Sequence, residues 1–196
     1  MEKINFIKTF IPQGDFREKY EHGGMMVRHL AAVLDEKMGA YECYECTVPI
    51  GEYDEGEIQK VFAEFSVKMD ALKLEQAKVD KIAEIAAYDT SSSVNGFILN
   101  GLLVWLDKAT RVGLMNSTTI AKAAGQETTT LWLGDVKLEV DCDKAIQLLS
   151  ALEMYALECF NVTAAHKAAV AELKTIKEVE AFDATADYPQ QLVMKL

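Results

Sequence analysis

The pattern of apolar and polar positions predicts two long helices. From Ile58 to Ala86, apolar residues recur in steps of four and three, which is the 3.5-residue period of a coiled-coil seam. A second run with this period extends from Ala145 to Leu173. Asp54 with Glu57 predicts a capping box for the first helix, and Asp141 is suited to cap the second. The large seam residues are Ile58, Phe62, Phe65, Met69, Leu72 and Val79 in the first helix and Leu149, Leu152 and Val170 in the second.

The first seam needs a covering surface. At 1.5 Å per residue, a helix from Glu57 to Tyr88 reaches roughly 48 Å, which exceeds the radius of a compact domain of this size. Burying its six large seam residues is worth about 10 kcal/mol as an upper estimate. Either the second long helix of the same chain or another copy of the chain could cover this seam, and the sequence leaves both alternatives open.

Residues 1–54 are expected to form a small α/β unit that docks to a partner. Lys3–Ile11 is rich in β-branched and aromatic residues and predicts a strand that ends in a turn at Pro12. Met25–Met38 has apolar residues at helical spacing and is followed by Gly39, which predicts a helix. Tyr41–Val48 predicts a second strand.

The chain from 91 to 196 predicts two β-hairpins packed with helices. Asn100-Gly101 between two short apolar runs is a strong hairpin signal, and a second hairpin is expected between Thr128 and Val140. The four strands are predicted to form one small sheet, with Trp105 and Trp132 packed beneath a helix. With a connecting helix over 55–90, the whole chain is predicted to be a helix-rich α+β protein.

A short pattern occurs twice, at Ile82–Ser91 and Ile176–Thr185. Both segments fit I-x-E-[IV]-x-A-[YF]-D-x-[ST], in which Tyr88 aligns with Phe182. We expect both aromatic side chains to pack against the hairpin sheet while the following Asp binds backbone groups at the helix exit. Chance similarity between two amphipathic helix ends is the alternative.

Composition narrows the classes of partner. The 196 residues include 31 acidic and 20 basic side chains, for a net charge of −11, and three of the basic residues are arginines. This balance argues against a nucleic-acid partner. The sequence has no run of 18 apolar residues and its start lacks a signal-peptide core, so we expect no membrane partner and synthesis in a cytoplasm.

The candidate chemistry is weak. Cys43 and Cys46 form a CxxC pair that could join His22 and His29 at a zinc ion, but residues three apart on a strand point to opposite faces. His166 falls on a helical seam without an assignable nucleophile, so it is expected to be a core histidine. We therefore expect no metal, no cofactor and no catalytic residue.

Four segments resemble a known family. They are VWLDKATRVGL at 104–114, TTLWL at 129–133, ALEMYALECFNVTAAHKAAVA at 151–171 and EVEAFDATADYP at 178–189. In this order they are similar to an uncharacterised C-terminal domain carried by many tailed-phage and prophage proteins, especially of gut Bacteroidetes, and encoded among tail and tail-fibre genes. The resemblance covers about residues 79–190 and implies a role in the virion or its assembly, with no established catalytic or metal-binding residues.

The resemblance implies a structural protein of a tailed bacteriophage, of which a tail or tail-fibre attachment component is the favoured kind. Its expected partners are other phage virion proteins and further copies of the chain. The expected location is the tail region of the virion, after assembly in the host cytoplasm. A tail-fibre assembly chaperone that is absent from the mature particle is the alternative, and an enzyme is the least favoured class.

Overall fold

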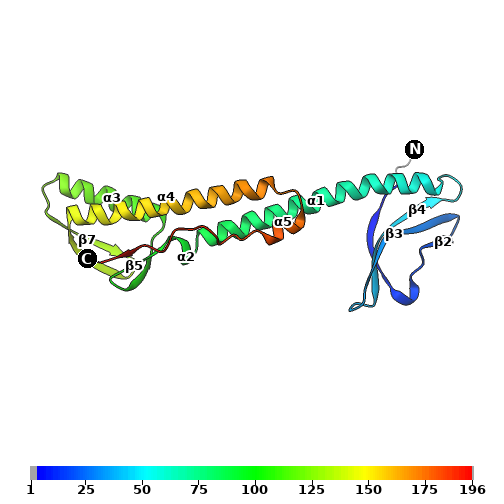
Figure 1. The fold of residues 1–196 in the computed structure, drawn as a ribbon, viewed down its shortest axis with the longest axis horizontal. Helices are drawn as coiled ribbons and strands as arrows, with labels where there is room; N and C mark the ends of the chain where they lie inside the picture. The colour runs from blue at the N-terminus through cyan, green and yellow to red at the C-terminus, as the bar shows by residue number, and fades with distance from the viewer. Residues whose placement is uncertain (1–3, 196) are drawn as a thin grey trace. The chain divides into compact units, whose positions relative to one another are not determined.

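The computed structural model describes residues 4–195 and shows a mixed α+β protein, as the sequence predicted. The chain forms two compact units, and the division between Lys73 and Leu74 falls inside the long helix α1 (Glu55–Asp89) (Figure 1). The reciprocal capping box is present at the start of α1: the Asp54 N–H donates to Glu57 at 2.9 Å and the Glu57 N–H donates to Asp54 at 2.8 Å. Local sequence therefore sets where this helix begins.

The first unit is an antiparallel sheet that packs against the start of α1. The strand order is β1-β4-β3-β2, and a 3₁₀ helix at Gln13–Asp15 joins β1 to β2. The strands are β1 (Ile7–Pro12), β2 (Lys19–His22), β3 (Met25–Asp35) and β4 (Ala40–Pro49). Lys3, where the sequence predicted the first strand to begin, lies outside the described residues.

The predicted helix over Met25–Met38 is wrong, because this segment is the central strand β3. From Met26 to Leu30 every residue is buried, so both faces of the strand are covered and the sequence shows no two-residue alternation. Without that alternation, the period of the sequence cannot distinguish a strand buried on both faces from a buried helix. Gly23 and Gly24, both with positive φ, form the turn between β2 and β3.

The core of the first unit lies between the sheet and α1. Ile58, from the first turns of α1, is fully buried among Met26, Leu30, Cys46 and Val48. An aromatic group adjoins this cluster, with ring centroids 5.0–6.1 Å apart, and consists of Phe6, Tyr44, Phe62 and Phe65. The predicted seam residues at the start of α1 therefore pack within the first unit.

The second unit contains the rest of α1 and all later elements. The elements after α1 are α2 (Ser92–Asn95), β5 (Gly96–Leu99), β6 (Leu102–Trp105), α3 (Lys108–Ala123), β7 (Thr128–Leu133), β8 (Val136–Asp141), α4 (Cys142–Glu172), α5 (Ile176–Ala181) and β9 (Val193–Met194). Both predicted hairpins are present, and Asn100 and Gly101 have positive φ at the first turn.

The two hairpins do not form the single four-stranded sheet that the sequence predicted. β7 and β8 form a separate two-stranded sheet, whereas β5 and β6 are joined by β9 in the order β6-β5-β9. β9 pairs parallel to β5 after the chain returns from α5 along the helices (Figure 1). The final segment therefore occupies the side of β5 that a second hairpin would need.

α4 carries the main core of the second unit along its predicted seam. Its first turn is capped by Asp141, which accepts hydrogen bonds from the backbone N–H groups of Asp143 and Lys144. α3 and the β7–β8 hairpin pack along the first part of the helix. The buried seam positions are Ala145, Leu149, Leu152, Cys159, Thr163, His166 and Val170.

The second part of α1 uses a different face from the one that the sequence indicated. Leu72 and Val79, both predicted in the seam, are exposed, whereas Ile85 is fully buried with Val170 and Ala184. Two lysines occupy positions on the packed face with only 12% of each side chain exposed: Lys78 Nζ donates to the Ala171 carbonyl oxygen at 2.8 Å, and Lys81 pairs with Glu84. The aliphatic part of each lysine side chain packs against the neighbouring elements, while its ammonium group is bound by an acceptor. The packed face of α1 therefore contains charged residues, and the apolar pattern of the sequence does not identify it.

Candidate docking surface

The edge strand β6 exposes apolar side chains. β6 pairs with β5 on one side and has no neighbouring strand on the other within the described residues. Val104 points into the core, whereas Leu102, Leu103 and Trp105 are exposed. Soluble proteins commonly protect sheet edges with charges or prolines, because an apolar edge can pair with another chain. This strand has neither.

Close packing fixes the β5–β6 hairpin behind this edge. Gly96 lies opposite Trp105 in the register of the hairpin and is buried. A Cβ atom at Gly96 would lie 2.2 Å from the Ser92 carbonyl oxygen and 3.1 Å from Leu103 Cδ1. Glycine is thus the residue that lets α2 run directly into β5.

The two tryptophans do not pack beneath a helix as predicted. Trp105 is 44% exposed and Trp132 is 57% exposed. Strand alternation directs their neighbours inward instead, so that Leu131 and Leu133 on either side of Trp132 are buried. Around Trp105 the sequence does not indicate which side chains point inward, because every residue from Leu102 to Leu106 is apolar.

A groove of about 580 Å³ runs between Trp105 and α4. Exposed Leu157 and Phe160 of α4 line it together with Trp105. The buried Arg111 borders the groove, where its Nη1 donates to the Leu106 carbonyl oxygen at 2.7 Å and its Nε donates to Glu153 at 2.9 Å. The guanidinium thus links α3 to α4 and to the residue after β6. These hydrogen bonds hold in place the elements that carry the exposed apolar side chains of the groove.

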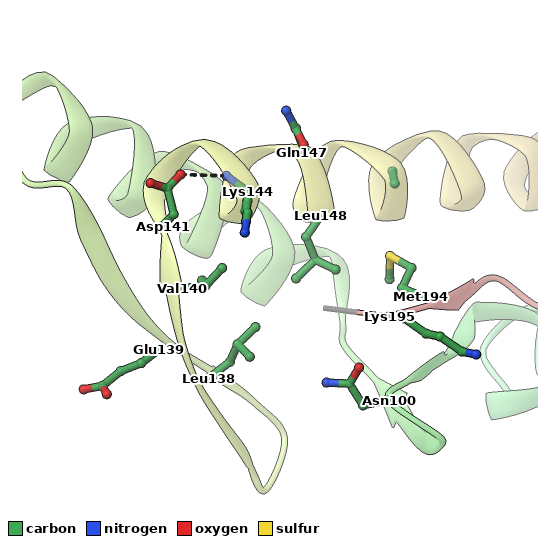
Figure 2. A pocket seen from close by; sticks show the side chains of 11 residues that line it. Asn100, Leu138, Glu139, Val140, Asp141, Lys144, Gln147, Leu148, Met194 and Lys195 are labelled. Atoms are coloured by element: carbon green, nitrogen blue, oxygen red, sulfur yellow. Dashed lines mark hydrogen bonds between the residues drawn. The ribbon is translucent and has the colours of Figure 1, made fainter.

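A larger hollow of about 770 Å³ lies between the β7–β8 hairpin, α4 and β9 (Figure 2). Leu138, Val140 and Leu148 face it, and Met194 borders it from β9. The nearby Asp141 is engaged as the cap of α4, while the Glu139 and Gln147 side chains point away. In a site that orients a small molecule, a few polar groups converge on one point. The polar groups around this hollow do not converge in this way.

A partly buried polar cluster joins α1, α4 and the segment after α5. The Thr163 hydroxyl donates to Asp89 at 2.7 Å, and Tyr188 donates to the Thr163 oxygen at 2.8 Å. Burial raises the pKa of the Tyr188 hydroxyl, which favours its role as a donor. His166 is 7% exposed, as predicted for a core histidine, and its Nδ1 has no hydrogen-bond partner among the described residues.

The aromatic residues of the repeated pattern meet this cluster instead of the hairpin sheet. Tyr88 contacts Tyr188 with ring centroids 5.3 Å apart, and His166 lies edge-on to both Tyr188 and Phe182. Tyr88 and Phe182 therefore belong to one row of rings beside α4, which corrects the predicted packing. Asp183 binds the Thr185 backbone N–H as expected, but Asp89 binds a hydroxyl.

The thiols are poorly placed for chemistry. All four cysteines are free and buried, and burial raises the pKa values of Cys43, Cys46 and Cys159. A raised pKa reduces the thiolate that nucleophilic attack or metal binding requires. Among residues 4–195, no three His, Cys, Asp or Glu side chains gather in a way that could hold a metal ion. None of the helices in the described part of the chain is both long and apolar enough to cross a bilayer.

Comparison with known proteins places the second unit in a family. The family described as "Domain of unknown function (DUF4376)" matches residues 76–186, more than half of the chain. The chain belongs to the DUF4376 family. The DUF4376 match begins in the second part of α1 and ends after α5, so it includes both tryptophan hairpins and leaves the N-terminal sheet outside. No curated protein and no solved structure matches the chain.

Proposed function

We propose that this chain is a structural protein of a tailed-phage virion, in which it attaches or adapts a tail or tail-fibre component by docking to other virion proteins. The exposed apolar edge of β6 is the observation that carries the proposal. An extended segment of a partner would add to this edge as a further strand. Backbone hydrogen bonds would supply affinity and Leu103 and Trp105 would supply specificity.

The surrounding structure is consistent with a docking part. Tryptophan contributes strongly to binding at protein interfaces, and Trp105 stands on a hairpin that Gly96 and Arg111 hold in place. The resemblance to domains encoded among phage tail genes gives the biological setting. In a tail, repeated copies would make individually weak contacts additive.

Mass spectrometry of purified particles tests the proposal in the phage that encodes the chain. Stoichiometric presence in the mature virion supports a structural part, whereas presence only in assembly intermediates identifies the alternative, an assembly chaperone. Leu103→Glu should remove the chain from particles, because the charge blocks apolar strand addition. Ile120→Glu, an equally simple change at an exposed apolar residue of α3, is the matched control and should leave incorporation intact.

A further inference from the structure

The outer face of α4 is an exposed surface almost without charge. Ten positions between Met154 and Ala171 are exposed, and Glu158 is the one charged residue among them. The other nine are Met154, Leu157, Phe160, Asn161, Ala164, Ala165, Ala168, Ala169 and Ala171. The three large apolar side chains are 50–62% exposed. An uncharged helical face of this length is unusual on a chain with a net charge of −11.

This face has the spacing of a second coiled-coil seam. Its central positions alternate in steps of three and four and are Met154, Leu157, Asn161, Ala164, Ala168 and Ala171. They lie opposite the buried seam through Cys159, Thr163, His166 and Val170. Large side chains occupy the N-terminal half of the stripe and alanines occupy the C-terminal half.

We infer that this face of α4 binds the same face of a second copy of the chain, with the two helices antiparallel. A twofold axis beside residues 162 and 163 places Met154 against Ala171 of the second copy, Leu157 against Ala168, and Asn161 against Ala164. Each large side chain then packs against a small one of the other copy. The stripe is therefore self-complementary when the two helices are antiparallel. This inference names one partner for the structural role proposed above, and it uses α4 and not the edge of β6.

Charge favours a second copy in this orientation. Two copies of an acidic chain repel each other over most of their surface, and this face lets them approach with few carboxylates between them. In the antiparallel arrangement Glu158 lies beside Ala165 of the other helix. A parallel arrangement would place Glu153 of one helix beside Glu158 of the other, and the alanines of the two stripes would pack against each other. Asn161, close to the axis, would fix the register, as polar seam residues do.

The oligomeric state of the full chain tests the interface. Light scattering and sedimentation over a range of concentrations should show a dimer for the wild type. Ala168→Glu should raise the dissociation constant at least about 100-fold, because a twofold interface buries the uncompensated charge twice. The control is Ala83→Glu: Ala83 is an exposed alanine of α1 on the seam that the sequence indicated, and its substitution should leave the dimer unchanged. Circular dichroism should show both variants folded.

Cysteine cross-linking tests the orientation. Leu157→Cys and Ala168→Cys variants should form a disulfide with each other when mixed and oxidised, and neither should cross-link to itself. In the antiparallel dimer, identical positions 168 lie roughly 16 Å apart along the helix axis, beyond the reach of a disulfide. The native cysteines are buried and should not compete. Self-linking of either variant would show a parallel pair and overturn the orientation.

A wild-type monomer at high concentration would overturn the interface, as would dissociation by Ala83→Glu but not by Ala168→Glu. These outcomes are separate from the fate of the proposed function. A dimeric chain that is absent from virions keeps the α4 interface and rejects the structural role. A monomeric chain that is incorporated through β6 rejects the α4 interface and keeps the structural role.

Discussion

At the level of single residues, the carboxylate of Glu55 shows how a surface ion pair couples the first unit to pH. Gln59 Nε2 donates to Glu55 at 3.1 Å, and Arg28 Nη2 donates to it at 2.7 Å from a nearly buried side chain. These hydrogen bonds lower the pKa of the Glu55 carboxyl in the folded state. The stabilisation is therefore present above the unfolded-state pKa and is lost as the pH falls through the folded-state pKa.

Glu55→Gln should lower the free energy of unfolding at neutral pH and have a smaller effect at an acidic pH below the lowered folded-state pKa of the wild-type carboxyl. Urea unfolding at both pH values measures the difference. Glu64→Gln, at an exposed position on the same helix, is the control for removing one negative charge. An equal loss of stability at both pH values would contradict the role of the ionised carboxylate.

Residue-scale features were the ones that the sequence predicted best, because their causes are local. The Asp54–Glu57 capping box, the Asp141 cap of α4 and the Asn100-Gly101 turn all form where they were predicted. The exposure of Trp105 was missed. Which face of a short strand points inward depends on what packs against it, and the apolar run around Trp105 carries no sign of that.

At the level of elements, α1 offers a direct test of which face is packed. Ile85→Ala should destabilise the second unit by about 2–5 kcal/mol, because the fully buried side chain packs against Val170 and Ala184. Val79→Ala, on the seam that the sequence indicated, should change stability by less than about 0.5 kcal/mol because the residue is exposed. Thermal and denaturant unfolding of the full chain measure both effects. The reverse order would restore the predicted seam.

The elements that the sequence missed are those that depend on distant partners. Met25–Met38 was misread because α1 covers one face of β3 and the segment around Phe16 covers the other, where Phe16 and Tyr20 contact His29. The short strands β2 and β9 exist through pairing with β3 and β5 and have too few residues for a periodic signal. The long helices were predicted correctly because capping and period agree over many turns.

At the level of the whole molecule, the chain has separate cores. The core around Ile58 contains only residues of the first unit. The core around Leu149 and Leu152 contains only residues of the second. α1 is the element that contributes to both units, with Ile58 at one end and Ile85 near the other. Each core buries its own apolar surface, so damage to one removes contacts from that unit alone.

Hydrogen exchange in the full chain should resolve the two cores. Ile58→Ala removes a fully buried side chain and should speed amide exchange in β3 and β4 while β7 and β8 keep their protection. Leu152→Ala should do the reverse, because Leu152 packs with Leu131, Leu133 and Val140. Each truncation costs about 2–5 kcal/mol, enough to change local exchange rates by more than tenfold. If either variant accelerated exchange equally in both sheets, the units would unfold as one body and α1 would transmit stability between them.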